Sequence, residues 1–96
     1  MAGLSEIERY QLFLQALGIK VPAKEKDLRA LVDGILVRLP VDERNVISLR
    51  FGIYGAEHIF SHEEAGSKLE MRVYKVENFQ RMGICLARIE ARSINL

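Results

Sequence analysis

The sequence predicts an all-α fold in which five helices form one small domain. Apolar residues return at intervals of three and four in five successive segments, and no stretch alternates apolar and polar residues long enough to indicate a strand. The 96-residue length allows one hydrophobic core but not two. We therefore expect a single domain over residues 1–96, with an N-terminal helix and linker over 1–22 and the other helices over 24–96.

The first helix is predicted to begin after Ser5, because Ser5 and Glu8 have the spacing of a capping box, and to end at Gly18. Residues 20–23, which contain a proline, interrupt the pattern, and a second helix follows over about 24–40. The apolar stripes are Ile7, Tyr10, Leu14 and Leu17 in the first helix and Leu28, Leu31, Val32, Ile35, Leu36 and Leu39 in the second.

A short third helix is expected after Pro40, which ends the second. It has acids in its first turn, arginines further along and Gly52 as its C-terminal stop. Residues 53–60 contain a glycine and show no clear period, so they are predicted to form a connecting loop.

The last two helices are predicted to form a helix-turn-helix. Ser61 and Glu64 make a second capping box, which opens a short helix that ends at Leu69. After a turn at residues 70–71, a longer helix runs to Ser93. Its apolar stripe is Val73, Val76, Phe79, Met82 or Gly83, and Leu86. Two helices joined by a tight turn, with the second longer, match this motif.

A group of apolar residues in and before the fifth helix is predicted to belong to the core. Met71, Phe79 and Met82 favour core packing over a ligand pocket, and Cys85 is expected among them as a small buried hydrophobe. Cys85 is the only cysteine, so an internal disulfide and a thiolate zinc cage are excluded. This cysteine content suits a reducing cytoplasm.

Composition argues against several classes of function. The 14 basic and 13 acidic residues give a net charge of +1, so any basic face must be local. No apolar run approaches the roughly 20 residues that span a bilayer, and the first residues are acidic, unlike a secretory signal. We expect a cytoplasmic protein with no membrane partner.

Catalytic and metal-binding chemistry is not expected. His58 and His62 are four residues apart, but His58 falls in the predicted loop, so the two do not share a helical face. The sequence contains no nucleophile with a partnered base and no phosphate-binding glycine loop. The prediction is a protein that is not an enzyme and takes no metal or cofactor.

The N-terminal helix carries more apolar surface than one stripe needs. Leu12 and Phe13 add to Tyr10, Leu14 and Leu17. Either this helix covers an extended core or it contacts a protein partner.

An ordered set of short motifs lies between Leu31 and Met71. They are Leu39-Pro40, Glu43-Arg44, Arg50-Phe51-Gly52, Ser61 and Glu63-Glu64-Ala65-Gly66. In this order and spacing they resemble the fourth conserved region, the C-terminal promoter-binding domain, of bacterial housekeeping sigma factors. Phe51 would fill the core, Gly52 would allow a left-handed helix end, Ser61 would cap, and Gly66 would let two helices approach closely.

The resemblance weakens after Met71, in the helix that reads promoter DNA in the family. Val73 and Glu77 stand where the family usually has arginines, and Tyr74 stands where it has a glutamate. A carboxylate at position 77 would repel phosphates. The residues that still suit DNA contact are Arg72, Lys75, Asn78 and Arg81, on successive turns of one helix. Asn78 suits an adenine edge, and the three basic side chains suit phosphates or guanine.

The resemblance implies a transcription regulator that engages RNA polymerase core, whose flap element receives this domain in the family, and contacts double-stranded promoter DNA. The polymerase side would use Arg44 and Arg50, with the apolar surface near Ile47 and Phe51 unless these are core. The DNA-melting region of a full sigma factor does not fit before Leu31, so we expect a stand-alone regulator or an excised domain.

An alternative is a protein-interaction module that has lost DNA reading and binds or sequesters a transcription component. Val73, Tyr74 and Glu77 would then contact the partner, since an apolar and an aromatic residue on an exposed helix suit a protein surface better than phosphate.

Overall fold

The computed structural model describes residues 3–22 and 24–95, and within them the fold is all-α, as predicted. The helices are α1 (Glu6–Ala16), α2 (Glu25–Leu36), α3 (Val41–Phe51), α4 (His62–Leu69) and α5 (Val73–Asn95). Ala23, where the predicted linker break ends, lies outside the described residues, as do positions 1, 2 and 96 of the predicted domain. None of the described helices is long and apolar enough to cross a membrane.

Both predicted capping boxes form. The Ser5 hydroxyl accepts the Glu8 N–H at 3.2 Å and the Glu8 carboxylate accepts the Ser5 N–H at 2.9 Å. Ser61 and Glu64 repeat this geometry at 3.1 and 2.9 Å. These hydrogen bonds hold the pKa of Glu8 and of Glu64 below the ordinary value, because only the ionised carboxylate accepts so well. Each box therefore stabilises its helix above the ordinary glutamate pKa and loses that contribution as the pH falls through the lowered one.

The other helix ends follow the sequence to within two residues, except the end of α2. Gly52 ends α3 in the left-handed conformation, with φ 67°. α2 ends at Leu36, four residues before the predicted end at Pro40, and Leu39 is still buried. After Leu36 the Arg38 N–H donates to the Ile35 carbonyl, and the Leu39 N–H donates to the Leu36 carbonyl. The apolar stripe therefore continues through a tighter turn rather than an α-helix.

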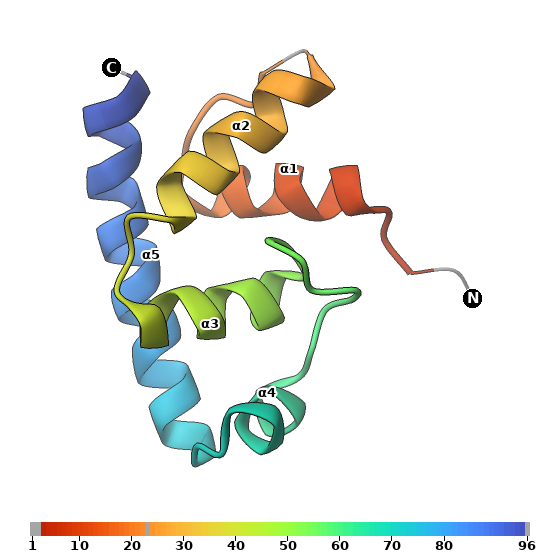
Figure 1. Cartoon of the computed structure of the whole chain (residues 1–96), viewed down its shortest axis with the longest axis vertical. Helices are drawn as coiled ribbons and strands as arrows, with labels where there is room; N and C mark the ends of the chain where they lie inside the picture. The colour runs from red at the N-terminus through yellow and green to blue at the C-terminus, as the bar shows by residue number, and fades with distance from the viewer. Residues whose placement is uncertain (1–2, 23, 96) are drawn as a thin grey trace.

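The helices are arranged along α5. Figure 1 shows α4 beside the start of α5, α3 beside its middle, and α2 and α1 toward its C-terminal end, all on one side of it. The molecule measures 35 × 33 × 18 Å. Since one helix with its side chains is roughly 10–12 Å across, the thin dimension holds no more than two layers. One long face of α5 lies at the surface, where Asn78, Met82, Cys85 and Ile89 are exposed.

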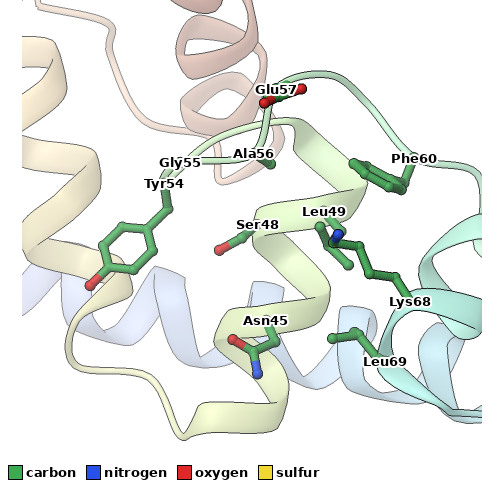
Figure 2. Close-up of a pocket in the computed structure, with 10 residues that line it drawn as sticks. All are labelled: Asn45, Ser48, Leu49, Tyr54, Gly55, Ala56, Glu57, Phe60, Lys68 and Leu69. Atoms are coloured by element: carbon green, nitrogen blue, oxygen red, sulfur yellow. The ribbon is translucent and has the colours of Figure 1, made fainter.

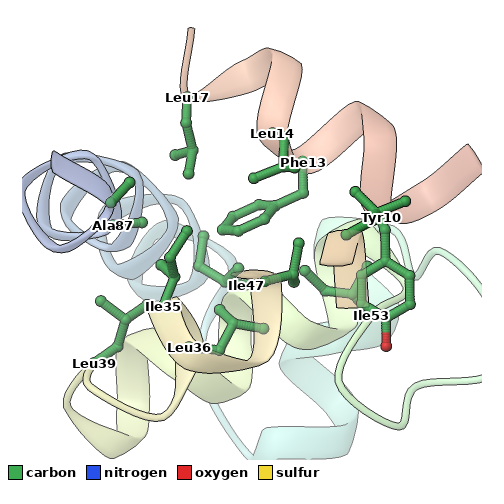
Figure 3. Close-up of a cluster of buried hydrophobic side chains, with 13 residues drawn as sticks. Tyr10, Phe13, Leu14, Leu17, Ile35, Leu36, Leu39, Ile47, Ile53 and Ala87 are labelled. Carbon is green, nitrogen blue, oxygen red and sulfur yellow. The ribbon is translucent and has the colours of Figure 1, made fainter. Parts of the chain in front are cut away.

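The main core joins α1, α2, α3 and the C-terminal half of α5. Figure 3 shows Phe13 and Leu14 of α1 directed toward Ile47 of α3, beside Ile35 of α2 and Ala87 of α5. A second, smaller cluster joins α3, α4 and the start of α5. Its buried members are Val46, Leu49, Ala65 and Val76, with Met71 and Phe79 packed against it as predicted.

The N-terminal helix covers the core, which was one of the two alternatives. Tyr10, Phe13, Leu14 and Leu17 are all buried, and Leu12 is 40% exposed. The interior therefore accounts for the extra apolar surface of α1, apart from Leu12.

Two core predictions in α5 were wrong. Met82 is 53% exposed, and Cys85 is exposed rather than buried. Gly83 takes the interior position instead. A Cβ on Gly83 would lie 2.7 Å from Cγ1 of Ile47, so only glycine lets α5 approach α3 this closely at that point. With Gly83 facing α3, Met82 and Cys85 are turned toward solvent.

Arg9, which no sequence pattern singled out, ties α1 to the end of α3. It is 8% exposed, and its guanidinium donates to the Gly52 carbonyl at 2.6 Å and to the Leu4 carbonyl at 2.7 Å. The neighbouring Tyr10 is buried, and this burial raises the pKa of its hydroxyl. The predicted loop is confirmed, and its first residue, Ile53, is buried in the main core with Tyr10 and Phe13.

Candidate nucleic-acid interface

The connection between α4 and α5 fits a helix-turn-helix. Only Glu70, Met71 and Arg72 separate the two helices, and Glu70 adopts a left-handed conformation with φ 56°. The Met71 N–H donates to the Gly66 carbonyl at 2.8 Å. A Cβ on Gly66 would lie 2.6 Å from the Met71 carbonyl oxygen and 3.6 Å from Cγ2 of Val76. The absence of a side chain at Gly66 thus lets the turn fold back on α4. It also lets α5 pack against α4.

The four residues predicted to contact DNA are all exposed. Arg72 precedes α5, and Lys75, Asn78 and Arg81 lie in its first half, while Val76 is fully buried against α3 and α4. In a helix, a step of three residues falls about 60° short of a full turn. Lys75, Asn78 and Arg81 therefore spiral across the exposed side of the helix rather than forming one straight row, and Asn78 and Arg81 lie nearest the side opposite Val76.

Asn78 and Arg81 are brought together by a side-chain hydrogen bond. A terminal nitrogen of Arg81 donates to Oδ1 of Asn78 at 3.1 Å. Reading an adenine edge requires the same oxygen as an acceptor together with the amide nitrogen as a donor. An amide oxygen can accept two hydrogen bonds, so the bond from Arg81 leaves one lone pair and the amide nitrogen of Asn78 available to adenine.

The three positions that depart from the sigma-factor pattern are also exposed. Tyr74 is 56% exposed and Val73 is 37% exposed, and Glu77 reaches the surface one turn before Arg81. This part of α5 thus presents basic, aromatic and acidic side chains together. It does not form a uniformly positive surface.

The residues predicted to face the polymerase do not form one open surface. Ile47 is fully buried and Phe51 packs against the main core, so both are core residues. Arg50 is half-buried and donates to the Gln80 side chain at 3.0 Å and to the Phe60 carbonyl. It therefore joins α3 to α5 and to the loop. Arg44 is half-buried as well.

A cavity of about 700 Å³ lies between α3, the loop and the end of α4, and no sequence pattern indicated it. Figure 2 shows Leu49, Leu69 and Phe60 lining it beside the Lys68 side chain. The Lys68 ammonium lies 5.9 Å from the centre of the Phe60 ring, against which His58 stacks at 4.2 Å. His58 is thus an aromatic packing residue. Among the described residues, no group of three or more His, Cys, Asp or Glu side chains is placed to hold a metal ion.

The fold and this site define a small all-α protein whose last two helices fit a helix-turn-helix. No protein-family model matches the chain, and comparisons with characterised proteins and with solved structures find no match either.

Proposed function

We propose that this protein is a cytoplasmic transcription regulator that resembles a stand-alone sigma-factor region four. It would engage RNA polymerase core and contact double-stranded promoter DNA through the first half of α5. The main supporting observation is the placement of α5, whose start is anchored by Val76 and leaves Lys75 and Asn78 exposed beyond a three-residue turn. A helix with one face exposed in this way can enter a major groove, while its basic residues contact phosphates.

The DNA-contact role predicts a specific response to charge removal. The double variant Arg72→Ala/Lys75→Ala should bind every duplex sequence about tenfold more weakly at low salt. The slope of log affinity against log salt concentration should become shallower by about 2, because two phosphate contacts are lost. Fluorescence polarisation of a labelled duplex at several salt concentrations measures both quantities.

A matched control is Lys24→Ala/Lys26→Ala, which removes the same charge from exposed positions at the start of α2. This control should retain the affinity and the slope. Glu77→Arg should strengthen binding, because it replaces a repelled carboxylate with a phosphate donor. Equal losses in the two double variants, or no measurable salt-dependent binding, would rule out the DNA contact.

The polymerase role is tested separately by gel filtration of the purified chain with RNA polymerase core. Co-elution is expected, and Arg44→Glu should reduce it, because a half-buried arginine at an interface is costly to reverse in charge. Failure to co-elute would remove the polymerase from the proposal whatever the DNA result.

A second function is favoured by one specific observation, the exposure of Val73 and Tyr74 at the start of α5. An exposed aromatic residue on a helix is a typical anchor for a protein partner. In this alternative the module binds or sequesters a transcription component and does not read DNA. Tyr74→Ala would then abolish partner capture, and duplex binding would be absent at every salt concentration.

A further inference from the structure

The C-terminal half of α5 has an apolar outer face. Met82 is 53% exposed and Ile89 is 60% exposed, with the exposed Cys85 between them. Spacings of three and four residues place these three side chains on one stripe, here called the outer ridge. In Figure 1 the other four helices all lie to one side of α5, and none of these three side chains is buried against them. The outer ridge is therefore an apolar surface that the fold itself does not cover.

One edge of the outer ridge is lined with arginines. Arg81, Arg88 and Arg92 follow each other at seven and four residues, so they lie on the same side of α5. Among the described residues, Arg29 and Arg38 form ion pairs with carboxylates, and these three arginines form none. The partners of Arg81 and Arg88 are uncharged, namely Asn78 and the Ala16 carbonyl. The positive charge of this edge is therefore not balanced by a salt bridge.

A shallow groove of about 460 Å³ follows the arginine edge. Ile84 and Cys85 line it together with Arg81 and Arg88, and His62 borders it from the start of α4. Glu77 also borders the groove, at the end near the turn. The groove thus combines apolar side chains with basic ones, and its single carboxylate stands at one end.

We propose that the outer ridge and its arginine edge dock an amphipathic helix of another protein, with carboxylates along one side. Apolar residues at intervals of three and four on that helix would pack on Met82, Cys85 and Ile89, as in other helix-in-groove contacts. Its carboxylates would face Arg81, Arg88 and Arg92, where arginine can hold them by paired hydrogen bonds.

A second copy of this chain does not supply those carboxylates. In an antiparallel pair of α5 helices the two arginine edges would face each other, which is repulsive. In a parallel pair the arginine edge would face the other side of the ridge, where Phe79, Leu86 and Ser93 lie. The charge of the face therefore favours an acidic partner over self-association.

This inference goes beyond the proposed function and does not rest on it. The proposed DNA contacts end at Arg81, which the two surfaces share, and the outer ridge runs from Met82 to Ile89. A partner helix can bind the outer ridge of the free protein whether or not the chain binds DNA.

The test uses the full chain and two synthetic peptides of about 20 residues, long enough to form helices. One has leucines at intervals of three and four and glutamates along one side, and its twin has lysines in place of the glutamates. The acidic peptide is expected to bind about tenfold more tightly at low salt in a polarisation titration, and the difference should shrink at high salt. The double variant Met82→Gln/Ile89→Gln should bind the acidic peptide about tenfold more weakly than the native chain does.

A charge exchange makes the test specific. Arg81→Glu/Arg88→Glu should invert the preference, so that the lysine peptide becomes the tighter ligand. Lys24→Glu/Lys26→Glu, at exposed positions of α2 remote from the outer ridge, is the matched control and should leave the preference unchanged. All four positions of the ridge and edge variants are exposed, and circular dichroism checks that these variants fold.

Equal binding of the two peptides, no binding of either, or a preference that survives the charge exchange would overturn the proposal. So would a concentration-dependent dimer in sedimentation equilibrium that Met82→Gln/Ile89→Gln dissolves, because the ridge would then serve a second copy. Absence of duplex binding in the polarisation titration with DNA would not affect these outcomes.

Discussion

Replacing Phe13 with alanine is expected to lower the free energy of unfolding by about 3–5 kcal/mol. Phe13 is fully buried, and its ring meets the Phe51 ring edge to face with centroids 5.3 Å apart. Removing it leaves a cavity where α1, α2, α3 and α5 meet. A domain of this size has a total stability of roughly 5–15 kcal/mol, so the variant should be close to unfolding. Urea denaturation followed by circular dichroism measures the difference.

Leu12→Ala is the control, because it truncates the preceding residue of the same helix at a position that is 40% exposed. It should cost less than about 1 kcal/mol. If the two substitutions had equal effects, α1 would be a peripheral attachment and not part of the core.

Replacing Gly52 with alanine is expected to destabilise the protein by about 2–4 kcal/mol, for two independent reasons. Gly52 has φ 67°, a backbone angle at which any residue with a side chain is strained, whatever the space around it. The added Cβ would also lie 2.6 Å from Cδ of Arg9 and 2.9 Å from the carbonyl carbon of His58. Because the His58 backbone cannot move as a side chain can, overpacking adds to the conformational cost.

Gly18→Ala separates the two reasons. Gly18 has φ 74°, but no atom lies within 4 Å of the position that an added methyl group would take, so the substitution should cost only about 1 kcal/mol. In the Arg9→Ala background, Gly52→Ala should cost less than in the native chain, since one of its two close contacts is gone. Equal costs for Gly18→Ala and Gly52→Ala would show that the loop does not pack tightly on Gly52.

Local signals predicted most of the helix boundaries. Ser5 and Ser61 each lie three residues before a glutamate, and both capping boxes form because this geometry involves only neighbouring residues. The stop at Gly52 follows for the same reason, since a left-handed helix end favours glycine. Lys75, Asn78 and Arg81 were found exposed because their spacing from the buried Val76 places them on other sides of the same helix.

Features that join distant segments could not be predicted in this way. Met82 and Gly83 both fit a helical period, and only the approach of α3 places Gly83 inside and Met82 outside. Arg9 was not anticipated as a buried residue, because its carbonyl partner on Gly52 is 43 residues away in the sequence. Arg50 was predicted to be available to a partner, but its bonds to Gln80 and Phe60 occupy its guanidinium.

The sequence by itself determined the helices, their caps and the turn between the last two, because each depends on hydrogen bonds and φ angles within a few residues. Only the tertiary structure decided which side of α5 faces α3, and with it which residues of α5 stay open to DNA or to a partner. Helical periodicity defines a stripe only to within one residue on either side, whereas close packing against Ile47 leaves room for glycine alone.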